Sequence, residues 1–187
     1  MRLLLRFSLP MLVGNIFQQF YSMVDAMIVG RFVGVDALAA VGATGGMSFL
    51  VLGFVIGLAN GFCVVVSQRF GARDEAGLRR CVAMTMLLSL IVTAVATAAS
   101  FLGTEPMLRA MNTPENIFSD SAAYIGIIFL GLGASLFYNL FSGLLRAVGD
   151  SRTPLYFLIV ASALNIALDI LFITRFHMGV AGAAWAT

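Results

Sequence analysis

Two aspartates stand inside long segments that otherwise carry no charge. Asp25 is the only charged residue between positions 7 and 30, and Asp169 is the only one between positions 153 and 174. A carboxylate within a membrane-crossing helix costs roughly 2.5–3.5 kcal/mol on insertion scales, so it usually marks an ion pathway, a proton relay or a ligand site. We therefore expect these two carboxylates to carry the chemistry of the chain.

The two carboxylates are expected to share one depth. Asp25 precedes Arg31 by six residues, and Asp169 precedes Arg175 by six residues. Both helices are predicted to run outward. At 1.5 Å per residue, each carboxylate then lies about 9 Å below the outer end of its helix.

Two more oxygen-bearing side chains are expected beside them. Asn165 is four residues before Asp169 and shares its helix face. Thr187 lies eight residues along a segment that starts near Gly179 and runs inward, about 12 Å deep. No Arg or Lys is expected at this depth, so a bound cation or a proton must neutralise the carboxylates. Oxygen ligands suit Na⁺ or H⁺ rather than a transition metal, which favours His or Cys. We predict a site for a cation or a proton, without transition metal or cofactor, formed by Asp25, Asn165, Asp169 and Thr187.

Other polar residues form stripes on three of the apolar segments. On the first segment Asn15, Gln18 and Ser22 are spaced, together with Asp25, by three, four and three residues, which places them on one helix face with Gln19 beside it. A polar stripe cannot face lipid cheaply, so it faces the bundle interior or a water-filled cavity. Hydrogen bonds that hold neighbouring helices together are the alternative for the Ser, Thr and Asn residues. The residues predicted to line a cavity are Asn15, Gln18, Gln19, Ser22, Tyr138, Asn139 and Ser162.

The composition shows which elements must position these residues. Of the 187 residues, 60% are hydrophobic and 11% charged, the mean hydropathy is +1.00 and the net charge is +2. This excludes an ordinary soluble enzyme, a disordered segment and a nucleic-acid partner, because soluble domains carry roughly a quarter charged residues. A crossing helix needs about 20 mostly apolar residues. We predict an all-α integral membrane helix bundle with five full transmembrane helices, at residues 7–30, 37–68, 81–104, 121–145 and 153–174, and the start of a sixth at 178–187.

Arginines set the expected orientation. Eight lie on the side of the N-terminus and three on the other side. Basic loops stay cytoplasmic, so the N-terminus is predicted inside, and Arg31, Arg109 and Arg175 outside. The last segment stops at about half a crossing, which suggests a piece of a longer protein.

Two local patterns add packing and boundary expectations. Gly53, Gly57 and Gly61 form a GxxxGxxxG stripe. Such a stripe lets another helix approach closely, and packing within this bundle is the favoured interpretation. Thr153 is expected to cap a helix that begins at Pro154.

Seven stretches of the sequence resemble the multidrug and toxic compound extrusion (MATE) transporters, and among them the bacterial NorM- and DinF-like members. Each stretch falls at the expected helix or loop, and together they run through the whole chain. They are residues 9–12, 18–30, 36–42, 67–71, 146–154, 165–169 and 179–184.

The resemblance implies a fold and an activity. Family members have twelve helices in two lobes of six and export amphipathic, often cationic drugs in exchange for Na⁺ or H⁺. Residues 1–187 then form the first lobe, truncated in its sixth helix, in the bilayer of a bacterial inner membrane. The resemblance matches Asp25, Asn165, Asp169 and Thr187 to the family's cation site. The C-terminal lobe is missing, which puts transport by this chain alone in doubt.

Three alternatives stay open at this point. A lipid-linked oligosaccharide flippase of the same superfamily is disfavoured because all eleven arginines lie near helix ends. An intramembrane aspartyl protease is disfavoured because Asp169 follows Ile-Ala-Leu rather than Gly-x-Gly, so we expect no enzyme. A non-transporting remnant or assembly partner is not excluded. The substrate, and the choice between Na⁺ and H⁺, are not predicted.

Overall fold

The computed structural model describes residues 2–187, with side chains from residue 8 onward. Arg2 and Arg6, which contribute to the expected orientation, have side chains outside the described part. The elements are α1 (Arg2–Phe32), α2 (Val35–Gly71), α3 (Glu75–Ala110), α4 (Glu115–Leu130), α5 (Leu132–Ala147), α6 (Arg152–Ile170), a π-helical turn η1 (Leu171–Arg175) and α7 (Gly179–Ala186). The described residues contain no strand, which confirms the all-α fold.

Within the described residues, three helical segments are long and apolar enough to cross a membrane on their own. They are α2, α3 and the continuous segment of α6 and η1. The pair α4 and α5 counts as a fourth crossing if it forms one bent span. The predicted first crossing, residues 7–30, falls in α1, which has sufficient length at 31 residues but is not among the helices apolar enough to cross a membrane. Its polar stripe is the physical reason for this difference.

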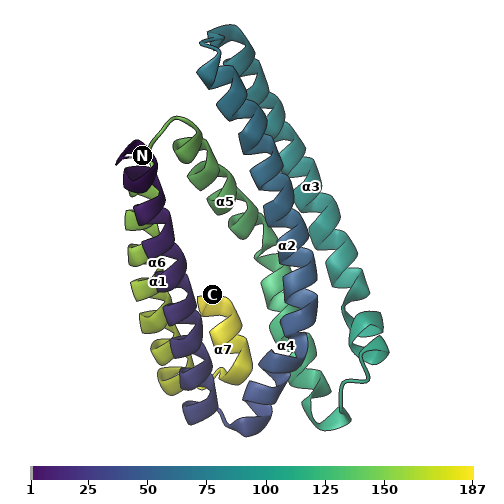
Figure 1. The fold of residues 1–187 in the computed structure, drawn as a ribbon. Coiled ribbons are helices and arrows are strands. Elements are labelled where there is room, and N and C mark those ends of the chain that lie inside the picture. The colour runs from purple at the N-terminus through teal and green to yellow at the C-terminus, as the bar shows by residue number, and fades with distance from the viewer. Residues whose placement is uncertain (1) are drawn as a thin grey trace.

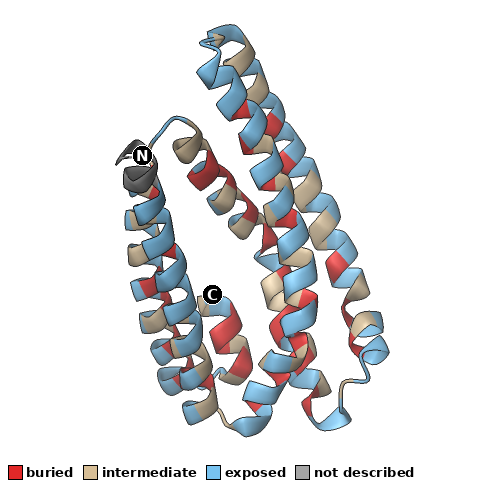
Figure 2. Ribbon diagram, in the orientation of Figure 1, coloured by how far each residue is buried: buried red, intermediate tan, exposed pale blue. Residues whose placement is uncertain are grey.

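The helices form two packed groups (Figure 1). On one side α1 packs along α6, and on the other α2 packs against α3, α4 and α5. The short helix α7 lies between the groups and contacts α4, α6 and η1. Buried residues lie mainly where helices face each other, and much of the outer surface of α2 and α3 is exposed (Figure 2). The exposed side chains there include large apolar ones such as Phe49 and Leu102, as lipid contact requires.

Helix α4 belongs to both apolar cores. Tyr124 packs in a core with Ile28 and Val29 of α1, together with residues of η1 and α7. The next residue, Ile125, packs in a second core with α2, α3 and α5. Adjacent positions on α4 therefore connect the two groups of helices.

The predicted fourth crossing is broken. Residues 121–145 were expected as one span, but α4 and α5 meet at Gly131 with a bend of 44°. Gly133, just beyond the break, lies against α3, because a Cβ built there would be 3.0 Å from Thr93 Cγ2. Glycines at the bend allow this close approach, and the sequence has no proline there to signal a break.

The glycine stripe of α2 does not serve the expected packing. Built Cβ atoms at Gly53, Gly57 and Gly61 meet no atom of the described residues within 4 Å. The expectation that this stripe packs within the bundle is therefore wrong for this chain. The close contact of α2 is made elsewhere: Cys63 faces Gly143 of α5, and a Cβ at Gly143 would overlap the Cys63 sulfur and lie 3.2 Å from its Cβ.

The start of α6 is capped by a different residue from the one expected. The helix begins at Arg152, and the carboxylate of Asp150 accepts hydrogen bonds from the backbone N–H groups of Arg152 and Thr153, both at 3.0 Å. It also accepts the Thr153 hydroxyl at 2.6 Å. Thr153 is thus a donor to the cap and not the cap itself. The bonds from Thr153 hold the pKa of Asp150 below its usual value.

Substitution of Gly143 tests the close packing of α2 on α5. Gly143→Ala should lower stability by about 1–3 kcal/mol through overpacking, and Cys63→Ala should relieve most of the loss by removing the sulfur. Unfolding in mixed micelles measures both effects. The control Gly57→Ala, which enters open space, should cost nothing. Equal losses at the two glycines would contradict the packing described.

The cap of α6 should also show a pH dependence. The pKa of Asp150 is lowered by folding, so its stabilisation is complete above the unfolded value of about 3.8 and disappears as pH falls through the native value. Asp150→Ala should therefore reduce Tm at pH 7 and make little difference well below pH 3.8. Thermal melting of both proteins across this range measures the effect, and a pH-independent difference would contradict it.

Candidate functional site

The carboxyl groups of Asp25 and Asp169 lie beside each other between α1 and α6. Asp169 is fully buried at 0% exposure, and Asp25 is partly buried. The two groups are close enough to interact directly. Neither oxygen of Asp169 nor Oδ1 of Asp25 has a hydrogen-bond partner among the described residues. The expected meeting of these two residues is thus present in the structure.

Asn165 connects this pair to α7. Its side-chain N–H donates to the carbonyl oxygen of Ala186 at 3.0 Å, while its own carbonyl oxygen is buried and unpaired. Thr187 follows Ala186 directly, and its hydroxyl donates to the carbonyl oxygen of Ala183 at 3.0 Å. Thr187 is exposed, whereas Asn165 is buried.

No basic side chain neutralises the pair in the described part of the chain. The one ion pair there joins Arg69 to Asp74 at 3.1 Å, in the turn between α2 and α3. The same residues contain no group of three or more His, Cys, Asp or Glu side chains that could hold a metal ion. The site therefore offers buried carboxyl and amide oxygens.

Two tyrosines beside the carboxylates were not predicted. Tyr124 of α4 is buried, and both it and Tyr21 of α1 lie near Asp25 and Asp169. Tyr21 precedes Asp25 by four residues, so helical spacing could have revealed it. Tyr124 comes from another helix, and no spacing in the sequence connects it to the site.

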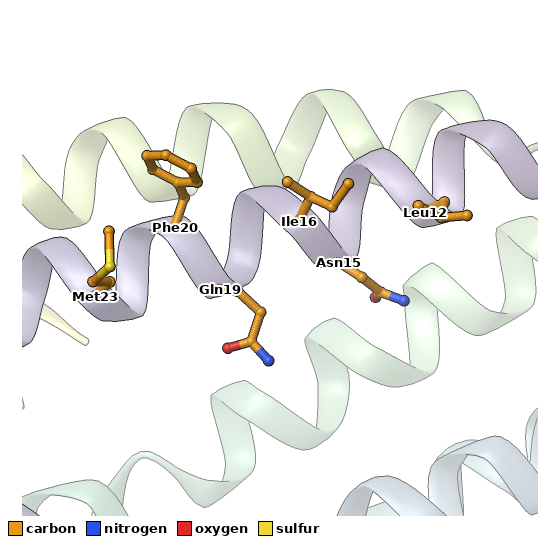
Figure 3. A pocket seen from close by; sticks show the side chains of 6 residues that line it. All are labelled: Leu12, Asn15, Ile16, Gln19, Phe20 and Met23. Carbon is orange, nitrogen blue, oxygen red and sulfur yellow. The ribbon is translucent and has the colours of Figure 1, made fainter.

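The predicted polar face of α1 borders a hollow of about 350 Å³. Asn15 and Gln19 line it together with the apolar residues Leu12, Ile16, Phe20 and Met23. Figure 3 shows the amides of Asn15 and Gln19 pointing from α1 towards α5, the green helix below it. Phe20 points to the opposite side of α1. Because Asp25 lies about 150° from the middle of this group on a helical projection, the hollow and the carboxylate pair are on different faces of α1.

The other residues predicted to line a cavity differ from one another in exposure and in hydrogen bonding. Gln18 and Ser22 are exposed, and the Ser22 hydroxyl donates to the Gln18 carbonyl. Tyr138 is exposed and lies near Tyr21, and Asn139 donates to the carbonyl of Ser135 in its own helix. Ser162 is 6% exposed, and its hydroxyl donates to the carbonyl oxygen of Leu158 in its own helix. It belongs to the buried face of α6.

Fold and site together define the class: an all-α polytopic membrane protein with a carboxylate pair buried between two helices. Comparison with known proteins makes the assignment specific. The MatE family model matches residues 10–171, and the chain belongs to this family. It is a family of transporters, not of enzymes.

Several of the chain's relatives are bacterial proteins named as probable multidrug resistance proteins. The chain is 36% identical over 185 residues to the probable multidrug resistance protein YoeA of Bacillus subtilis, with 97% of this chain and 40% of the relative covered. It is 30% identical to the DNA damage-inducible protein F of Escherichia coli, with 96% and 39% covered. The chain thus spans about two fifths of the length of these relatives.

Solved structures share the fold. A transporter of the MOP superfamily from Pyrococcus furiosus matches with a TM-score of 0.92 and 30% identity, over 99% of this chain and 41% of that one. An outward-facing multidrug resistance MATE family transporter matches with the same TM-score, identity and coverage.

The bond from Asn165 to α7 can be tested by substitution. Asn165→Leu should remove the hydrogen bond to Ala186 and cost roughly 0.5–1.5 kcal/mol. The amides of Ala183–Thr187 should then exchange hydrogen faster. Ser162→Ala, on the same helix, should leave their exchange unchanged because its hydroxyl bonds within α6. Unchanged exchange in Asn165→Leu would show that this bond does not hold α7.

Proposed function

We propose that residues 1–187 form one lobe of a cation-coupled antiporter that exports amphipathic, often cationic drugs or toxins. Asp25 and Asp169 take up a proton or Na⁺, Asn165 supplies a further oxygen, and Thr187 completes the site at its edge. The family and the names of the relatives support multidrug export. The share of the relatives that is covered supports a single lobe, with a second lobe supplied by chain outside these residues.

The unpaired oxygens of the carboxylate pair carry this proposal. Three carboxyl oxygens and the amide oxygen of Asn165 are buried and have no hydrogen-bond partner among the residues that the structure describes. Two neighbouring carboxylates in a poorly solvated interior repel each other, and removing each from water is costly. Binding a cation or a proton relieves both costs. Occupancy of the site therefore favours packing of α1 against α6, and emptying it favours their separation.

Coupling follows from this difference between the two states. A ligand shifts a conformational equilibrium only by its differential affinity for the two shapes. If the separated shape binds drug better, cation binding expels the drug and drug binding expels the cation. The hollow on α1 supports an amphipathic ligand, because two amides and four apolar side chains line it.

The proposed setting is a bacterial cytoplasmic membrane with the N-terminus inside. The turn between α2 and α3, which carries Arg69, Arg73, Arg79 and Arg80, is then cytoplasmic. Arg31, Arg109 and Arg175 lie at the outer ends of their helices.

Neutralising Asp25 or Asp169 tests the coupling role. Asp25→Asn or Asp169→Asn in the complete protein should reduce drug resistance to the level of a strain lacking the gene, because an amide cannot cycle between charged and neutral forms. Asp120→Asn, an exposed change of the same chemistry on α4, should keep resistance. Membrane abundance of each variant, measured by immunoblot, separates a loss of coupling from a failure to insert.

Transport in vesicles identifies the coupling ion. A drug gradient that drives Na⁺ movement at fixed pH supports sodium, and one that drives proton movement without Na⁺ supports protons. Normal transport by Asp25→Asn would reject the coupling role of this residue.

A further inference from the structure

A second hollow lies along the seam between α2 and α3. Its volume is about 430 Å³. Leu50, Phe54 and Leu58 line it from α2, and Ile91, Val95 and Ala99 line it from α3. Phe54, Ile91 and Val95 are each more than half exposed. A membrane-exposed groove of this composition accepts a hydrocarbon chain.

The two helices are longer than a bilayer requires. They have 37 and 36 residues, which corresponds to about 55 Å each, against about 30 Å of hydrocarbon. In Figure 1 the turn that joins them extends beyond the neighbouring ends of α1, α5 and α6. The turn therefore reaches the layer of the lipid headgroups.

Each of the two helices that line the hollow carries an arginine three helical turns away, towards the turn that joins them. Arg69 follows Leu58 by 11 residues and Arg80 precedes Ile91 by 11 residues, which is three helical turns and about 16–17 Å in both cases. Both arginines are exposed. No charged residue lies between Arg80 and Glu105 on α3, or between Asp36 and Arg69 on α2. Each wall therefore runs without charge from its arginine into the hollow.

The distance matches a phospholipid. One leaflet contributes about 15 Å of hydrocarbon and a headgroup layer of about 5–7 Å, so a chain end lies roughly 20 Å from its phosphate. A phosphate at the arginines would place the chain along the exposed side chains of Val65, Met84 and Leu88, with its tip at Leu58 and Ile91. The turn carries four arginines and two acids between positions 69 and 80, which favours a headgroup with net negative charge.

We propose that the seam between α2 and α3 binds an anionic phospholipid, with its phosphate on Arg80 and Arg69 and the end of one acyl chain in the hollow. Arg69 also pairs with Asp74, but its guanidinium has further N–H groups to donate. Arg80 forms no ion pair with the described residues and is the main phosphate ligand.

Native mass spectrometry of the complete, delipidated protein tests this site. Phosphatidylglycerol should bind more tightly than phosphatidylcholine with the same chains, and inorganic phosphate should not compete at equal concentration. Arg80→Gln should lower the affinity for phosphatidylglycerol several-fold. Arg31→Gln, which removes one exposed positive charge at the other end of the bundle, should not.

A second variant tests the acyl chain. Ile91 is more than half exposed and lies where the end of the chain is expected, so Ile91→Trp should fill this part of the hollow without disturbing the core. It should weaken binding of phosphatidylglycerol with sixteen-carbon chains but not with six-carbon chains. Equal binding of the two headgroups, equal effects of Arg80→Gln and Arg31→Gln, or no bound lipid at all would overturn the proposal. Competition by inorganic phosphate would show an anion site without lipid specificity.

Discussion

Two neighbouring carboxylates, one buried and one partly buried, with no basic partner among the described side chains, are the constraint on which this bundle depends. Asp169 has no access to solvent, and Asp25 lies beside it. Such an arrangement persists only where surrounding packing holds both backbones in place. The core formed by Ile28, Val29, Ile173 and Val180 does this, because it lies three or four residues beyond each aspartate on α1 and in η1, and is closed by α7. The apolar packing and the polar site are therefore parts of one arrangement.

Much of the helical architecture could be predicted because charge is so costly in a bilayer. Gaps between charged residues located α2, α3 and α6 as crossings. The break at Gly131 escaped prediction because the apolar run continues through it, and glycine alone does not require a bend. The cap of α6 was assigned to Thr153 because Thr-Pro is a common start, whereas the carboxylate of Asp150 is a stronger acceptor and captures two backbone N–H groups.

The candidate site, too, was predictable from the sequence only in part. Depth arithmetic on Asp25 and Asp169 places the two carboxylates beside each other, even though the π-helical turn η1 interrupts the regular α-helix between Asp169 and Arg175. Tyr124 could not be found, since its approach depends on how α4 packs and not on its own sequence. The stripe of Gly53, Gly57 and Gly61 shows the limit of motif reasoning: small residues permit a close neighbour, but they do not say that this chain provides one.

The position of α4 in both cores has a consequence for cooperativity. Tyr124 and Ile125 are consecutive, and a helix cannot shift one of them without carrying the other. The group of α1, α6 and α7 is thereby joined to the group of α2, α3 and α5 through a rigid element rather than a flexible connection. The bundle accordingly cannot come apart as two independent halves. Rearrangement around the aspartates must either move α4 as a body or be absorbed at its bend, where Gly131 separates it from α5.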